Sequence, residues 1–72
     1  MIKKEQLQAL RLQHPVGTKI VLIRMNDPAA PPVGTKGTVT GVDDIGDILV
    51  DWDNGSCLNV VPEVGWIRQI SE

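Results

Sequence analysis

The sequence contains no phenylalanine and no tyrosine, and tryptophan occupies only two of its 72 positions, Trp52 and Trp66. Surfaces that bind single-stranded nucleic acid usually combine a basic groove with several stacking aromatic rings. Peptide grooves of the SH3 type also normally use several aromatic side chains. The shortage of aromatic residues therefore weighs against both kinds of surface and draws attention to the two tryptophans.

The chain has one cysteine, Cys57, and one histidine, His14. A single cysteine cannot form an internal disulfide and is typical of a reducing compartment. Structural zinc takes four ligands, more than these two residues supply. Cysteine–histidine catalysis needs contact between the two side chains, whereas we expect His14 at the end of a helix and Cys57 in a strand. We therefore expect no catalytic residue, no metal, no cofactor and no enzymatic activity.

Long apolar segments are also missing. No run approaches the roughly 20 residues that a membrane span needs, and Glu5 and Gln6 stand where a signal peptide would begin its apolar region. The hydrophobic fraction of 42% and the charged fraction of 22% are those of a globular chain. We expect one cytoplasmic domain with a small core and no membrane partner.

Charge is unevenly distributed along the chain, whose net charge is −2. Six of the seven basic residues lie in residues 1–36, and seven of the nine acidic residues lie in residues 37–72. An acidic half is repelled by phosphate, which argues against nucleic acid lying on it. Part of this acidity is explained without any partner, because charged residues on the surface keep a small domain soluble.

Residues 1–14 are expected to form an N-terminal helical segment, with the helix over residues 3–14. Leu7 and Leu10 fall at helical spacing among good helix formers, and Pro15 ends the helix. A helix of this length is marginal alone and needs a surface on which to dock.

The next segment, Lys19–Met25, predicts a strand with apolar side chains on both faces. A strand of this kind is covered on both sides. We expect Ile20 and Leu22 to point into the core, and Val21 and Ile23 to lie beneath the leucines of the helix.

Four further strands follow at close spacing. A proline-stiffened loop over residues 26–33 precedes a second strand, Gly37–Val42, with a β-bulge at Gly41. The segments Ile48–Trp52 and Ser56–Val61 predict a hairpin, and Trp66–Ile70 predicts a short closing strand. A three-residue hairpin loop, Asp53-Asn54-Gly55, places Val50 opposite Leu58 and Ile48 opposite Val60, and requires a left-handed Gly55.

The most distinctive pattern is a phrase that occurs twice. Pro15-Val16-Gly17-Thr18-Lys19 recurs as Pro32-Val33-Gly34-Thr35-Lys36, and each copy leads into a strand. Short strands joined by tight turns indicate a mainly β fold, which we expect to be a five-stranded SH3-like barrel over residues 15–72 with the N-terminal helix outside it.

The second copy continues as Gly34-Thr35-Lys36-Gly37-Thr38-Val39-Thr40-Gly41-Val42-Asp43-Asp44-Ile45-Gly46 and is followed by Val50-Asp51-Trp52-Asp53-Asn54-Gly55-Ser56. This string resembles domain of unknown function 4314, over about residues 15–70, and the glycine–threonine–lysine pattern is similar to KOW barrels. The resemblance implies a bacterial, phage or mobile-element setting. It implies no activity and no site residues.

The function predicted from the residues is a small accessory module that binds a protein or peptide. Trp52 is expected in the core, whereas Trp66 is either a barrel plug or a binding anchor. The candidate binding residues are Trp66, Asp27, Pro28, Asp43, Asp44 and Asp47. The alternative is an RNA- or DNA-binding barrel, with a face made of Lys19, Arg24, Lys36 and Arg68. A small-molecule-binding accessory protein and a homo-oligomer are also compatible with the sequence.

Overall fold

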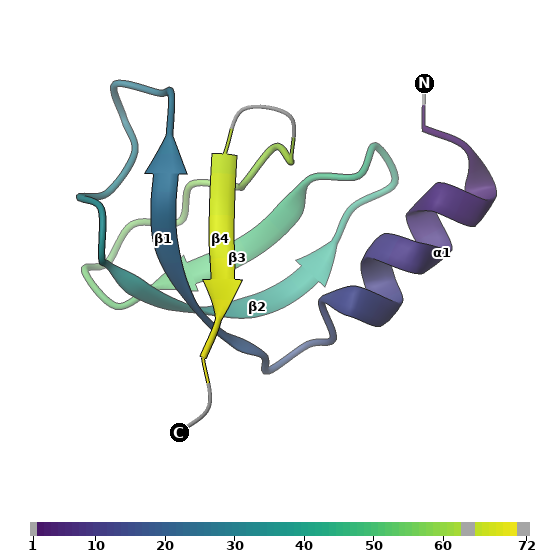
Figure 1. Cartoon of the computed structure of the whole chain (residues 1–72), viewed down its shortest axis with the longest axis horizontal. Coiled ribbons are helices and arrows are strands. Elements are labelled where there is room, and N and C mark those ends of the chain that lie inside the picture. The colour runs from purple at the N-terminus through teal and green to yellow at the C-terminus, as the bar shows by residue number, and fades with distance from the viewer. Residues whose placement is uncertain (1, 63–64, 71–72) are drawn as a thin grey trace.

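The computed structural model of the chain describes residues 2–62 and 65–70, and it is mainly β with one short helix (Figure 1). The elements are α1 (Lys4–Gln13), β1 (Lys19–Met25), β2 (Lys36–Val42), β3 (Ile48–Trp52) and β4 (Gly65–Gln69). The strands form one antiparallel sheet in the order β3-β2-β1-β4. Within the described residues, no helix is long and apolar enough to span a membrane.

The expected strand Ser56–Val61 is reduced to a single bridge between Ile48 and Val60. The predicted opposition of these two residues is therefore confirmed, but a fifth strand is absent from the described residues and the sheet is open. The physical reason lies at Leu58, whose carbonyl accepts a hydrogen bond of 2.9 Å from the Trp52 indole Nε1. A backbone oxygen held by a side chain in this way does not extend the ladder.

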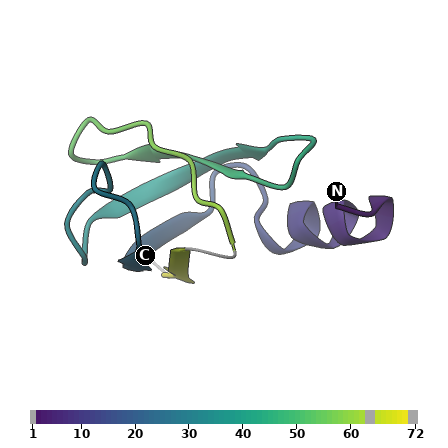
Figure 2. The same cartoon turned by 90° about the horizontal axis from the view of Figure 1, so that it is seen from above.

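The core lies on the concave side of the sheet. Its buried side chains are Ile20, Leu22, Val39, Ile48, Val50, Trp52 and Val60. Figure 2 shows the sheet curved, with β1 and β4 in a different layer from β3 and the segment that follows it. The predicted inward positions of Ile20, Leu22 and Trp52 are confirmed.

The two copies of the repeated phrase form the same turn. Thr18 donates a backbone hydrogen bond to the Pro15 carbonyl, and Thr35 donates one to the Pro32 carbonyl. The glycine at the third position has a positive φ in both copies, 91° at Gly17 and 90° for its counterpart. A positive φ at this place defines a type II turn and explains why glycine is needed there.

The repeat also organises the pairing of β1 with β2. The Gly17 amide donates to the Val39 carbonyl, and the Gly34 amide donates to the Leu22 carbonyl, each over 2.8 Å. Leu22 and Val39 occupy equivalent positions in the two copies, so each turn docks on the strand of the other copy. The register shifts that follow Leu22 in β1 and Val39 in β2 are equivalent as well, and the second confirms the bulge predicted at Gly41.

The helix does not lie where the sequence predicted. It stands beside the end of β2 (Figure 1), and Ile23 of β1, which it was expected to cover, is 47% exposed. Arg11 of α1 instead donates to the Val42 carbonyl and pairs with Asp44 over 3.0 Å. Contacts with the β2–β3 turn, and not the apolar outer side chains of β1, position the helix.

Candidate functional site

The convex surface of the sheet, opposite the core, collects the basic residues of the strands. Because Ile20 and Leu22 point into the core, Val21 between them points outward. Val21 lies directly opposite Lys36 of β2 and Arg68 of β4, so these three side chains form one outward row across the sheet. We call this surface the outer face; its residues are Lys19, Val21, Arg24, Lys36, Thr38, Trp66 and Arg68.

Trp66 is the aromatic residue of the outer face. It lies opposite Arg24 in the register, and the Arg24 guanidinium carbon is 5.7 Å from the centre of its ring. This is a cation–π distance, and it fixes the ring on the surface. Trp66 is 50% exposed, so the barrel-plug interpretation is wrong and an exposed aromatic surface remains.

Within residues 2–62 and 65–70, no carboxylate forms an ion pair with a cation of the outer face. Lys19 Nζ donates to the Thr38 hydroxyl over 2.8 Å. Among the described residues, the ion pair is that of Arg11 with Asp44. Asp44 follows the C-terminal end of β2, whereas Lys36 of the outer face begins this strand. Asp51, which lies opposite Thr38 on β3, marks the limit of the outer face.

The aspartates of the β2–β3 turn serve the turn itself. Asp43 Oδ1 accepts hydrogen bonds from the amides of Ile45 and Asp47, over 3.2 and 2.8 Å. Asp44 is held by Arg11. Burial, and then the charge of Asp43, raises the pKa of Asp47. A third negative charge at this turn is therefore unfavourable.

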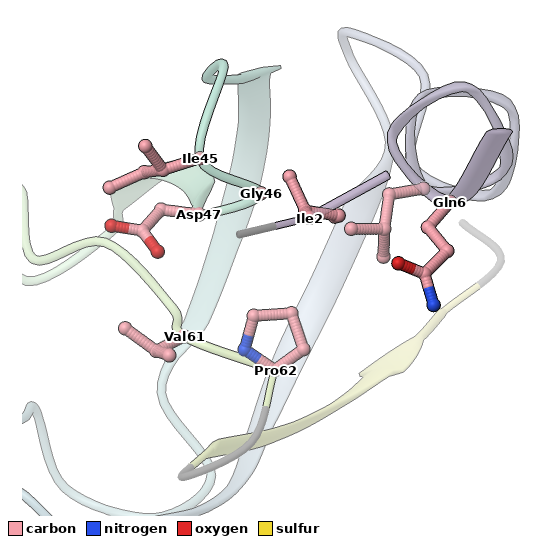
Figure 3. Close-up of a pocket in the computed structure, with 8 residues that line it drawn as sticks. Ile2, Gln6, Ile45, Gly46, Asp47, Val61 and Pro62 are labelled. Atoms are coloured by element: carbon pink, nitrogen blue, oxygen red, sulfur yellow. The ribbon is translucent and has the colours of Figure 1, made fainter. Parts of the chain in front are cut away.

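A hollow of about 490 Å³ lies between the start of the helix, the β2–β3 turn and the segment at Val61. It is lined by Ile2, Gln6, Leu10, Ile45, Gly46, Asp47, Val61 and Pro62. Figure 3 shows the Asp47 carboxylate on the side of the opening where Val61 lies, with Ile2 and Gln6 across from it. The walls are mostly aliphatic, and Asp47 is the charged side chain among the described residues that line them.

The family described as Domain of unknown function (DUF4314) matches the chain over residues 3–70. The chain belongs to this family. The match begins before the helix, so the resemblance predicted for about residues 15–70 was too short at its start. No curated protein and no solved structure matches the chain.

The DUF4314 domain does not bring the predicted peptide-binding residues together. Trp66 lies on the outer face, whereas Asp43, Asp44 and Asp47 lie in the β2–β3 turn. Asp27 and Pro28 belong to the β1–β2 loop, where Asp27 Oδ1 accepts from the Ala29 amide over 2.8 Å and so closes a turn.

The predicted basic residues, by contrast, do share one surface, the outer face. Sequence reasoning found all four of its cations but missed Val21, which it expected under the helix. It also missed the hollow, whose walls come from three separate parts of the chain. Among the described residues, no group of three or more histidine, cysteine or acidic side chains is arranged to hold a metal ion.

The raised pKa of Asp47 predicts how this DUF4314 domain responds to pH. Because the fold favours the neutral acid, ionisation of Asp47 lowers stability as the pH rises from below the ordinary aspartate range through the raised pKa. Asp47→Asn is expected to cause a small rise in melting temperature at pH 7 that disappears below about pH 4. Asp44→Asn, which removes the partner of Arg11, is the control. An equal gain from both variants, or a gain at low pH, would contradict this explanation.

Proposed function

We propose that this domain is a small non-enzymatic binding module and that its outer face binds single-stranded nucleic acid. The supporting observation is the position of Lys19, Arg24, Lys36 and Arg68 beside an exposed tryptophan on one convex surface. The acidic turn lies beyond the end of β2, so Asp43, Asp44 and Asp47 do not share this surface, and Asp51 lies at its edge, opposite Thr38. For this reason we prefer nucleic acid to the peptide partner that the sequence alone favours.

Each part of the outer face has a separate role in this proposal. Lys36 and Arg68 stand two strands apart, roughly 10 Å across the sheet, and contact successive parts of the phosphate backbone. Trp66, held by Arg24 from one side, stacks on an unpaired base through its exposed surface. An unpaired base is available in a single strand, whereas duplex bases are already stacked. One stacking ring and four cations predict modest, micromolar affinity with little sequence preference.

Fluorescence anisotropy with short oligouridylate and oligothymidylate tests this proposal. If four phosphates are neutralised, the binding constant should fall about 50-fold between about 50 and 200 mM monovalent salt. Lys36→Glu on the outer face should weaken binding about tenfold or more. Lys4→Glu on the helix makes the same charge change away from the outer face and should change affinity little. Absence of binding at low salt, or equal losses in the two variants, would contradict the proposal.

Peptide binding is retained as a second candidate function, on the evidence of the hollow. Its aliphatic walls and the Asp47 carboxylate complement a lysine or arginine side chain, which has an apolar stem and a cationic end. A small amphiphilic cation has the same chemistry. In an isothermal titration with lysine-rich peptides, Asp47→Asn should weaken binding and Lys36→Glu should not. The reverse result would exclude the hollow as the peptide site.

The wider assignments follow from the same features. We infer that the four strands and the Val60 bridge form an SH3-like barrel that is open along one side, related to KOW barrels. Residues 15–72 are the binding domain in this proposal, and residues 1–14 support its β2–β3 turn. The bacterial or phage setting and the cytoplasmic location stay predictions from the sequence.

A further inference from the structure

The last strand of the sheet, β4, has a free edge. It pairs with β1 on one side, and no strand of the described part of the chain pairs with its other side (Figure 1). Free edges present main-chain donors and acceptors to any strand that can approach. Proteins usually protect such edges with proline, charged side chains, bulges or very short strands, whereas Ile67, Arg68 and Gln69 contain no proline and one charged side chain, that of Arg68 on the outer face.

The hydrogen bonds of β1 show which groups of β4 point toward this edge. The Leu22 amide donates to the Thr35 carbonyl, and its carbonyl accepts from Gly34, so the main-chain groups of Leu22 face β2. Those of the preceding residue, Val21, therefore face β4. Arg68 lies opposite Val21, so the main-chain groups of Arg68 face β1. The Ile70 amide, two residues further along β4, donates to the Lys19 carbonyl of β1, as expected when every second residue faces the same neighbour. The amides and carbonyls of Ile67 and Gln69 consequently point to the free edge.

We propose that a second copy of this chain occupies the edge, through antiparallel pairing of β4 with β4 about a two-fold axis at Ile67. In this register the two Ile67 residues exchange both of their main-chain hydrogen bonds. The Gly65 amide is already bonded to the Val61 carbonyl over 3.0 Å, so the pair of Gln69 with the partner subunit's Gly65 forms one bond, from the Gln69 amide to that glycine's carbonyl.

The side chains of the outer face select this register. A two-fold axis at Ile67 places Trp66 opposite Arg68 of the partner subunit, so each tryptophan lies between that guanidinium and its own Arg24. An axis at Arg68 would instead place two arginines directly opposite each other, which is unfavourable. A shift of one residue also turns side chains to the wrong face of the sheet.

This pairing has a structural consequence. Antiparallel strands of one sheet keep their outward side chains on the same side, so the two outer faces would join into one basic surface. The paired edge is short, and its interface is below the range of stable dimers. Self-association is therefore weak and depends on protein concentration, and it is expected without nucleic acid.

Sedimentation and hydrogen exchange on the free protein test the dimer. Between about 10 μM and 1 mM, a range suited to a weak interface, the average mass should rise from 7.8 kDa toward twice that value. The Ile67 and Gln69 amides should exchange more slowly at the higher concentration. A constant mass, or exchange at these amides that does not depend on concentration, would overturn the proposal.

Matched variants locate the contact. Gln69→Pro removes an amide that points to the free edge and spares the hydrogen bonds to β1, whereas Gln69→Ala keeps this amide. The proline variant should remain monomeric and the alanine variant should associate like the parent protein. Association that persists in a folded Gln69→Pro protein would overturn the assignment. Ile67→Lys adds a charge at the two-fold axis and provides a second variant if the proline is not tolerated.

Discussion

Replacing Gly37 with alanine is expected to lower the free energy of unfolding by at least about 2 kcal/mol. Gly37 lies in the central strand β2, opposite Ile20 on one side and Trp52 on the other. A Cβ at this position would stand 2.7 Å from Val50 Cγ1 and 2.8 Å from Trp52 Cε3. Both neighbours are buried core side chains without room to move, so the substitution forces the two sides of the core apart.

Gly41 provides the matched control, because it is also a glycine of β2. Of the described residues, a Cβ there would meet Leu49 Cδ1 alone, at the ordinary contact distance of 3.7 Å. Gly41→Ala should change the unfolding free energy by less than about 1 kcal/mol, since the methyl group adds no clash. Urea unfolding followed by tryptophan fluorescence measures both variants. Equal losses in the two proteins would show that close packing at Gly37 is not what requires a glycine.

Trp52→Ala is expected to cost about 3–5 kcal/mol, enough to unfold a domain of this size. The side chain is 1% exposed, and its indole donates to the Leu58 carbonyl over 2.9 Å. Trp52→Phe keeps much of the apolar volume but leaves that carbonyl without its donor, and should cost about 1–3 kcal/mol. The phenylalanine variant should also speed amide exchange at Val60. Val60 pairs with Ile48 just after Leu58, so loss of the indole hydrogen bond at Leu58 loosens this pairing.

Unfolding curves and hydrogen exchange separate the two roles of Trp52. A phenylalanine variant as stable as the parent, with unchanged exchange at Val60, would mean that the indole hydrogen bond does not hold the segment after β3. An alanine variant that keeps most of its stability would contradict the central place of Trp52 in the core.

The central strands and turns could be predicted because their signals are local. Glycine at the third position of the repeated phrase specifies a turn with positive φ, and alternation along Ile20 and Leu22 specifies the buried face. The spacing of Val39 and Val42 indicated the bulge at Gly41. Gly55 has the predicted positive φ, 89°. Each of these features depends on a few neighbouring residues.

The features that could not be predicted depend on contacts between distant segments. The helix position rests on Arg11 and Asp44, and a hydrophobic pattern does not show which surface such a pair will choose. The segment after β3 departs from a strand because the Trp52 indole takes a backbone carbonyl, which alternation of apolar residues does not reveal. The cations of the outer face come from three strands, and the register between these strands is what shows that they lie together.

The most direct test of the proposed binding surface is a titration of the ¹⁵N-labelled protein with oligothymidylate, followed by two-dimensional NMR. Binding at the outer face predicts graded shifts at the amides of Val21, Lys36 and Arg68 and at the Trp66 indole. Residues 43–47 of the acidic turn should stay unchanged, because phosphate is repelled there. Shifts confined to the acidic turn and helix, or no shifts at low salt, would contradict a nucleic-acid-binding outer face.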